Sequence, residues 1–266
     1  MENLKESLKK GTVIRAKDFE WKKEGVFSLA HPVRKDLGAN NITGVVVDIP
    51  KGEIWKCCDM AKNQEVIVVI FKGSGNAKIG ETTQNVDQHS TLYAPTGIAY
   101  SIEAKVDMRI YIWQSDLLPE SKKSSNPILF NHLFNDETQL KGFKGTDPIQ
   151  QNDNPANMNF LFWPGTGSGH LSLHCGIQQP GQTFGIHHHP VSEELFIGVE
   201  GKGQVHLNGE WFDFEEGDIL YSPPNIYHGT RNPNKSTEAT RFVTCGGPVP
   251  FDENFYISAN LSSVVK

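Results

Sequence analysis

GQTFGIHHHPVSEELFIGVEG, residues 181–201, is the stretch that decides how this chain folds. His187 and His189 are two residues apart, so an extended strand directs both imidazoles to the same face. Glu194 begins the apolar run that follows, which is typical of the next strand. The stretch therefore predicts two β-strands that bring two imidazoles and a carboxylate together.

A second stretch, GDILYSPPNIYHGTRN (217–232), supplies His228 as a fourth metal-ligand candidate. Three imidazoles and one carboxylate inside a barrel suit Fe(II), Mn(II), Ni(II), Co(II) or Zn(II), and one ligand set serves all of them. Four protein ligands on an octahedral metal leave two positions for substrate or O2. We expect one divalent ion per chain, with Fe(II) favoured, and loss of the ion at low pH.

These two stretches resemble the motifs of the cupin superfamily. The first, G-x5-H-x-H-x(3,4)-E-x6-G, is matched with its spacing by Gly181, His187, His189, Glu194 and Gly201. The second, G-x5-P-x-G-x2-H-x3-N, is matched by Gly217, Pro223, His228 and Asn232, with Asn225 in place of the glycine. Asn also tolerates a positive φ, so this departure is mild. The resemblance implies a double-stranded β-helix, or jelly-roll, barrel with a metal inside.

The remainder of the chain also favours an all-β fold. Runs rich in β-branched and aromatic residues are separated by clusters of Gly, Pro, Asn and Asp. The predicted strands are 42–49, 65–71, 108–113, 170–177, 194–200 and 239–245.

A repeat with an offset of 128 residues indicates two tandem barrels. Phe71-Lys72-Gly73-Ser74-Gly75 falls on Val199-Glu200-Gly201-Lys202-Gly203, and Leu92-Tyr93-Ala94-Pro95 falls on Leu220-Tyr221-Ser222-Pro223. The resemblance then becomes one to a bicupin. We expect an extension packing on the barrels at 1–40, a degenerate barrel at 41–118, a connecting segment at 119–160, a metal-binding barrel at 161–250 and a tail at 251–266.

The first copy lacks the ligand set. At the same offset the four ligand positions fall on Asp59, Ala61, Val66 and Tyr100. We expect the first barrel to bind no metal and to serve in dimerisation or as a wall for the other site. A replacement site built on Cys57 and Cys58 is the alternative.

Several residues near the motifs remain alternatives. Glu193 also satisfies the shorter motif spacing, but strand alternation places it on the face opposite Glu194, which we prefer. His188 should point away from its neighbours. Three further histidines have no motif support and are interpreted as structural: His170, His174 and His206.

The metal site favours an enzyme, and two chemistries fit. A non-haem Fe(II)-type dioxygenase would act on an enol, diketone or catechol-like molecule, which suits an apolar lining with Phe196, Tyr221 and Tyr227. A Lewis-acid isomerase, epimerase or lyase of a sugar or hydroxy acid would need a general base near the metal, for which Tyr221, Tyr227, His174 and Glu193 are the candidates. Of these, Tyr221 and Tyr227 are the predicted catalytic residues. A non-catalytic metal-dependent small-molecule binder is the third hypothesis. Arg231 and Arg241 could each meet a carboxylate.

Composition excludes other classes. The net charge of −6 offers no basic surplus for nucleic acid. No apolar run approaches the roughly 20 residues of a membrane span, and MENLKESLKK at the start is no secretory signal. We therefore expect a cytoplasmic homodimer that acts on a small molecule, with four free thiols.

Overall fold

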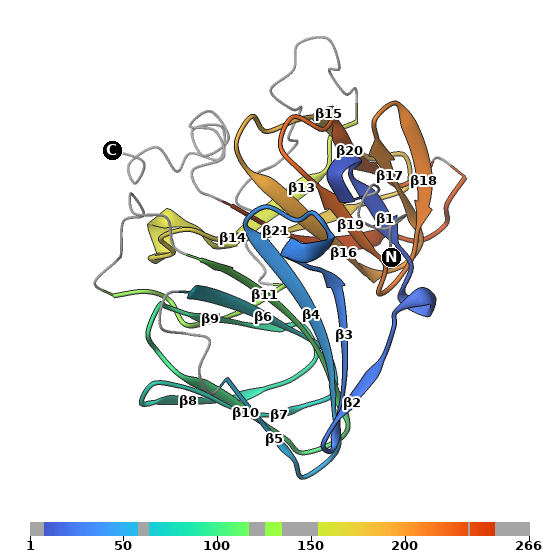
Figure 1. Cartoon of the computed structure of the whole chain (residues 1–266). Coiled ribbons are helices and arrows are strands. Elements are labelled where there is room, and N and C mark those ends of the chain that lie inside the picture. Colours follow the sequence, from blue (N-terminus) through green and yellow to red (C-terminus); the bar gives the residue numbers. More distant parts are fainter. Residues whose placement is uncertain (1–7, 58–63, 117–125, 135–153, 234, 248–266) are drawn as a thin grey trace.

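The computed structural model describes residues 8–57, 64–116, 126–134, 154–233 and 235–247. Strands dominate, and they form two barrels, each built from one large and one four-stranded sheet (Figure 1). This is the tandem all-β architecture that the sequence predicts. The predicted tail at 251–266 lies outside the described residues.

The first barrel combines a seven-stranded and a four-stranded sheet, all of whose neighbouring strands are antiparallel. In spatial order the larger sheet is β12 (Phe130–His132), β9 (Ser90–Ala94), β6 (Gln64–Lys72), β11 (Met108–Asp116), β4 (Ile42–Ile49), β3 (Phe27–Val33) and β2 (Lys22–Glu24). The smaller is β5 (Ile54–Lys56), β10 (Tyr100–Ala104), β7 (Gly75–Ile79) and β8 (Thr82–Val86).

The second barrel follows the same plan with six and four strands. Its larger sheet is β1 (Thr12–Ile14), β19 (Ile219–Ser222), β16 (Glu193–Glu200), β21 (Thr240–Gly247), β14 (Ser172–Gln178) and β13 (Asn157–Phe162). Its smaller sheet is β15 (Thr183–His187), β20 (His228–Arg231), β17 (Gly203–Leu207) and β18 (Glu210–Phe214). Short 3-10 turns lie at η1 (Ala16–Asp18), η2 (Lys35–Leu37) and η5 (Pro164–Thr166).

The predicted repeat is visible in the strand register. β7 and β17 begin 128 residues apart, and so do β8 and β18. The matching turn glycines, Gly73 and Gly201, both have positive φ, and a Cβ on either would lie within 2.6 Å of a backbone oxygen. Glycine is therefore required at both turns for the same steric reason.

The connecting segments are less separate than the sequence suggested. The expected extension at 1–40 contains β2 and β3, which belong to the first barrel's large sheet, and β1, which pairs with β19 of the second barrel. Similarly, β12 lies inside the expected connecting segment at 119–160 and β13 begins inside it, and they pair with β9 and β14. Terminal strands thus complete both barrels.

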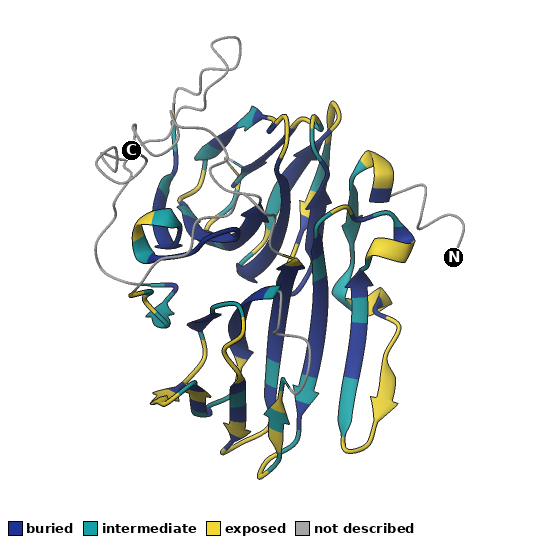
Figure 2. Cartoon of the chain, turned by 60° about the vertical axis from the view of Figure 1, so that its left-hand side comes forward, coloured by how far each residue is buried: buried dark blue, intermediate teal, exposed yellow. Residues whose placement is uncertain are grey.

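The two large sheets pack face to face, and this arrangement explains the apolar runs. One hydrophobic cluster fills each barrel, and a third lies between the barrels and includes Val69, Trp113, Leu195 and Val243. Every residue of β6 from Glu65 to Phe71 is buried, because one face of the strand lines the barrel and the other faces the partner barrel. Figure 2 shows these central strands dark blue along most of their length.

Two buried carboxylates join the barrels, and we call Glu65 and Glu193 the interface carboxylates. Glu65 of the first barrel accepts hydrogen bonds from the backbone N–H groups of residues 169–171 in the second, at 2.8 to 2.9 Å, and from the Tyr93 hydroxyl at 2.6 Å. Glu193 of the second barrel accepts N–H groups of residues 40–42 in the first and the Tyr221 hydroxyl. The two arrangements are related by the repeat.

No described helix is long and apolar enough to cross a membrane. Four free thiols are expected, and Cys175 and Cys245, both buried, are free in the structure.

Candidate metal centre

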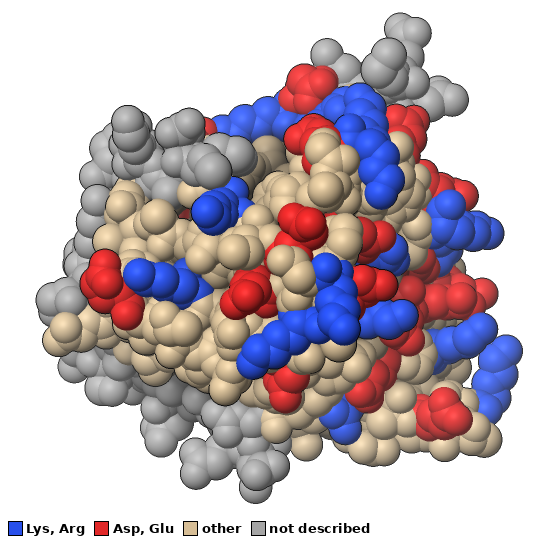
Figure 3. All heavy atoms as spheres, turned by 90° about the horizontal axis from the view of Figure 1, so that it is seen from below, with Lys and Arg blue, Asp and Glu red and all other residues tan. Residues whose placement is uncertain are grey.

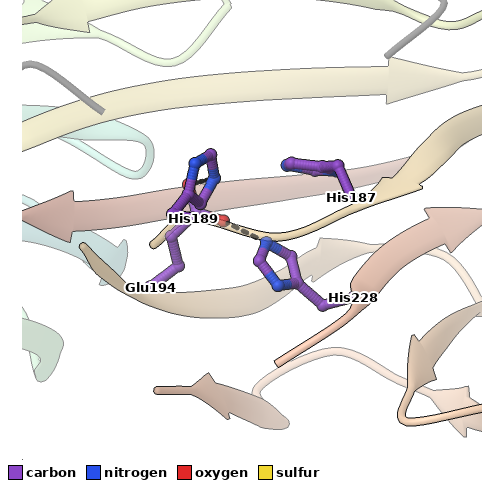
Figure 4. Close-up of side chains that lie close together, drawn as sticks. All are labelled: His187, His189, Glu194 and His228. Atoms are coloured by element: carbon purple, nitrogen blue, oxygen red, sulfur yellow. Dashed lines mark ion pairs between the residues drawn. The ribbon is translucent and has the colours of Figure 1, made fainter. Parts of the chain in front are cut away.

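The structure brings together the four ligand candidates that the sequence predicts. His187 ends β15, His189 follows it in the loop, Glu194 lies on β16 and His228 begins β20. One potential ligand atom from each lies within 4.8 Å of all the others, and all four residues are buried. Figure 4 shows the side chains pointing toward a common point.

Local pairing places the imidazoles. His187 lies directly across from His228 in the β15–β20 ladder, next to an irregularity in register after Phe184. Their ring centroids are 4.5 Å apart. The loop that carries His189 is held by the Asn225 N–H, which donates to the His189 carbonyl at 2.8 Å. Asn225 has a φ of 64°, as its place in the motif predicts.

Hydrogen bonds fix which ring nitrogens face the centre. Nδ1 of His187 lies 2.8 Å from the Gly185 carbonyl oxygen, and Nδ1 of His228 lies 2.8 Å from that of Ile226. A carbonyl only accepts, so each Nδ1 carries the proton and Nε2 keeps a lone pair for a metal. The Ser222 hydroxyl lies 2.8 Å from His228 Nδ1 and adds a second contact.

The spacing of the ligand atoms fits one ion. Bonds of about 2.1 Å place adjacent ligand atoms of an octahedral metal about 3 Å apart. His228 Nε2 lies 3.0 Å from one oxygen of Glu194, and His189 Nε2 lies 3.5 Å from the other. The donor set and its geometry therefore fit a divalent metal.

The pKa shifts of Glu194 and His187 also favour the protonation states that bind a metal. Burial opposes the ionisation of Glu194, but the adjacent His189 and His228 outweigh burial and hold its pKa well below the usual range. Burial, together with the neighbouring His228 and His189, lowers the pKa of His187 well below 6.5. At neutral pH the site thus offers a carboxylate and a neutral imidazole at these two positions.

The choice between Glu193 and Glu194 is decided by the two faces of β16. Glu194 points into the barrel with the histidines, whereas Glu193 is the interface carboxylate bonded to Tyr221 and to the backbone of residues 40–42. A Glu193 carboxylate committed to these donors lies on the opposite face of the strand, as alternation predicts.

The side chains of the two tyrosines predicted as catalytic are engaged with residues other than the four ligands. Tyr221 belongs to the hydrophobic cluster between the barrels, and burial and the adjacent Glu193 raise the pKa of its phenol. Tyr227 is 42% exposed, and its ring packs against His188 at 4.7 Å between centroids. Neither position supports the acid–base role that the sequence suggested.

Arg231 and Arg241, the two arginines predicted to meet a carboxylate, each contact an aromatic ring. The Arg231 guanidinium lies 4.0 Å above the Trp211 ring, and that of Arg241 lies 4.0 Å above Phe134. Phe196, in contrast, lines the site as expected, because its ring centroid lies 5.7 Å from that of His228.

Sequence reasoning did not place three polar residues inside the second barrel. Ser172 and Thr244 were not singled out, and His174 was named only as a structural residue or a candidate base. Ser172 and His174 alternate with Leu171, Leu173 and Cys175, which belong to the cluster between the barrels. That period-two pattern was visible in HLSLHCGI. His174 is near the centre: burial lowers its pKa to about 4, and Glu194, His189 and His228 are the charges that act on it.

In the first barrel, the positions equivalent to Glu194 and His228 hold Val66 and Tyr100, which pack in its apolar interior. Burial raises the pKa of Tyr100, so its phenol is neutral. The positions equivalent to His187 and His189, Asp59 and Ala61, lie outside the described residues. The part of the chain that the structure describes holds one group of potential metal ligands, in the second barrel.

Comparison with known proteins agrees with this geometry. Residues 177–244 match the Cupin domain family. A 68-residue segment, 26% of this chain, is 38% identical to a Streptomyces cyaneus protein named Polyketide synthase CurC and covers 43% of it. The chain spans about half the length of the curated relatives it matches.

Two solved structures share the fold over nearly the whole chain. YlbA from E. coli superposes with a TM-score of 0.69 at 14% identity, covering 90% of this chain and 91% of that one. An oxalate decarboxylase from Lactobacillus farciminis gives 0.66 at 13% identity, covering 92% and 90%. The second barrel is a cupin domain with a buried group able to bind a metal. The chain as a whole has the two-barrel fold of these solved structures.

Proposed function

We propose that the second barrel is the active centre of a metal-dependent enzyme that acts on a small organic molecule, with Fe(II)-type dioxygenation as the favoured reaction. The observation that carries this proposal is the buried group of three imidazoles and one carboxylate at ligand spacing. Buried polar groups of this kind destabilise a fold unless they are satisfied, and a bound ion satisfies all four together.

The surroundings of the site support an organic substrate. Phe160, Phe184, Phe196 and Phe242 belong to the apolar cluster that fills this barrel. A bound divalent ion would supply a Lewis-acidic centre with two positions for exogenous ligands and, in the case of iron, a one-electron redox couple. The phenylalanines exclude water and hold a flat apolar body, and the four ligands fix the ion.

Dioxygenation needs no co-substrate other than O2. O2 accepts four electrons from the substrate and both of its oxygen atoms enter the products, so no external reductant is required. A chain with a single site for metal and substrate could therefore complete the reaction alone.

A Lewis-acid lyase is the second candidate, and the fold likeness to oxalate decarboxylases favours it. That likeness is at 13% identity and concerns the fold. His174 is the interior imidazole that could move a proton in such a reaction, because it faces the ligand group from β14.

One experiment separates these candidates. Protein purified without chelators is analysed for metal and then supplied with enols, 1,3-diketones, catechols or hydroxy acids, with and without oxygen. The proposal predicts about one ion per chain and turnover that consumes O2. Turnover that is equally fast without oxygen would transfer the assignment to the lyase. Metal-free protein that still turns over substrate would overturn both.

The homodimeric state and cytoplasmic location remain predictions. On the face seen in Figure 3, basic and acidic side chains are interspersed, which supports a small-molecule partner over nucleic acid. Light scattering on the purified protein would measure its oligomeric state.

A further inference from the structure

Three polar side chains line the inside of the second barrel beside Glu194: Ser172 and His174 on β14, and Thr244 on β21. We propose that they form a hydrogen-bonding wall that holds the substrate's oxygen atoms next to the metal. The matching substrate class is a small, singly charged oxygen chelator with an apolar body, such as the enolate of a 1,3-diketone. This inference rests on the proposed function, because it requires a metal at the four ligands.

Strand register places the wall next to the metal group. On one level of the sheet Ser172 pairs with Gly246, and Gly246 pairs with Glu194. On the next level His174 pairs with Thr244, which pairs with Phe196. Residues directly opposite each other across strands share a face, so the wall faces the same interior as the Glu194 carboxylate.

The alternate residues confirm which face this is. On β14, Leu173 and Cys175 belong to the cluster between the barrels, and on β21 the same holds for Val243 and Cys245. The intervening side chains must therefore point into the second barrel. His174 agrees directly, because its ring lies 5.9 Å from that of Phe160, a residue of the interior cluster.

The two hydroxyls are buried and available. Ser172 and Thr244 are each 0% exposed. Among the residues that the structure describes, neither Oγ atom has a hydrogen-bond partner. A buried hydroxyl without a partner is unfavourable, so a ligand oxygen is the expected partner for both.

One strand separates the wall from the Glu194 carboxylate. Ser172 is two strands away from Glu194, which corresponds to roughly 10 Å between their backbones at the usual strand spacing. Gly246 occupies the strand between them and contributes no side chain to the interior. A molecule bound at the metal can therefore extend over Gly246 to reach the hydroxyls.

The charge of the wall selects the substrate class. The wall offers neutral donors, and no Lys or Arg side chain is buried anywhere in the described ranges. Negative charge on the substrate must then be neutralised by the metal ion, which already carries the Glu194 carboxylate. A single negative charge suits this site, whereas a dicarboxylate would place its second charge against uncharged groups.

The phenylalanine side chains of the barrel interior select an apolar body for the substrate. Phe242 packs across the wall's strand so closely that a Cβ on Gly176 would lie 2.1 Å from its ring. Phe184 and Phe196 contact Phe242 with centroids 5.5 and 6.0 Å apart. These rings form an apolar floor below the polar wall, so methyl or aromatic substituents would be held there.

The test uses the full-length protein loaded with Co(II), whose visible spectrum reports coordination. Acetylacetone and oxalate are titrated into wild type, Ser172→Ala and Thr244→Val, and metal content is measured in each. Thr240→Val is the matched control, because it lies on the same strand but its hydroxyl donates to the Glu200 carbonyl oxygen. Thermal unfolding of the metal-free proteins is recorded in parallel.

We expect acetylacetone to bind wild type more tightly than oxalate, and Thr244→Val to weaken it about 10- to 100-fold with metal content unchanged. The metal-free Thr244→Val protein should be at least as stable as wild type, since its hydroxyl has no internal partner. The control should bind acetylacetone as wild type does.

Each contrary result has its own meaning. Unchanged acetylacetone affinity in both wall variants would overturn the wall. Tighter binding of oxalate, or no acetylacetone binding by metal-loaded wild type, would overturn the substrate class. Wild type that retains no metal would overturn the proposed function itself.

Discussion

Removing the Glu65 carboxylate should destabilise the whole two-barrel structure, because one side chain accepts hydrogen bonds of 2.9 Å or less from four donors at the barrel interface. Three are backbone N–H groups of the second barrel, at Gly169, His170 and Leu171, and the fourth is the Tyr93 hydroxyl. Glu65 is 2% exposed, so water does not replace the carboxylate without rearrangement.

The magnitude follows from the number of orphaned donors. A buried donor that loses its partner costs about 1–3 kcal/mol, so four such donors with partial relaxation place Glu65→Ala at about 4–6 kcal/mol. Tyr93→Phe removes one bond to a charged acceptor and should cost about 1.5–3 kcal/mol. Domains have total stabilities of roughly 5–15 kcal/mol, so Glu65→Ala removes a large part of the total.

Urea unfolding followed by tryptophan fluorescence is a suitable assay, because Trp113 is buried between the barrels. Glu81→Ala is the control: its side chain is 99% exposed, so the change should be within about 0.5 kcal/mol of wild type. A loss below about 1 kcal/mol for Glu65→Ala would refute the reasoning, since unsatisfied buried donors cannot cost so little.

Three further predictions concern the second barrel. His228→Ala should lower bound metal from about one ion per chain to a small fraction while the circular dichroism spectrum stays unchanged, which elemental analysis checks. Tyr221→Phe should keep metal content and turnover but lose about 1.5–3 kcal/mol of stability in urea, as expected for a bond to Glu193; lost turnover at full metal content would restore its catalytic assignment. His174 has a folded-state pKa of about 4, against 6.5 in the unfolded chain. Between these values the unfolded chain binds one more proton, so the unfolding free energy of the metal-free protein should fall by roughly 3 kcal/mol from pH 6.5 to pH 4. His174→Gln should remove that component, and equal pH slopes in urea unfolding of the two proteins would contradict the assignment.

The ligand group could be predicted from sequence because its geometry is local. His187 ends β15, His189 follows two residues later, and one short loop leads from there to Glu194 on β16. The second-barrel wall could not be predicted in the same way. Whether Ser172 and Thr244 face the metal depends on the register between β14, β21 and β16, and these strands are distant in sequence.

The short strands that complete the barrels could not be predicted for a related reason. β1, β2 and β3 lie in a segment without a strong apolar run, and β1 and β2 are three residues each. Such strands are formed by pairing with an existing sheet edge, as β1 pairs with β19, and not by their own periodicity. Sequence patterns detect strands whose own residues form a long apolar run, which is why β6 and β16 were predicted.

Adjacent residues of one strand explain how the first barrel can lack metal ligands and still be required. On β16, Glu193 faces the other barrel and Glu194 faces the metal site; at the repeat offset these positions are Glu65 and Val66 on β6. The first barrel therefore has the interface carboxylate but an apolar residue in place of the metal ligand. Glu65 binds the backbone that leads directly into Ser172, so the first barrel fixes the start of the strand that carries the wall. Loss of Glu65 should then weaken acetylacetone binding in protein that is still folded and fully loaded with metal, whereas unchanged affinity there would limit the first barrel to stability alone.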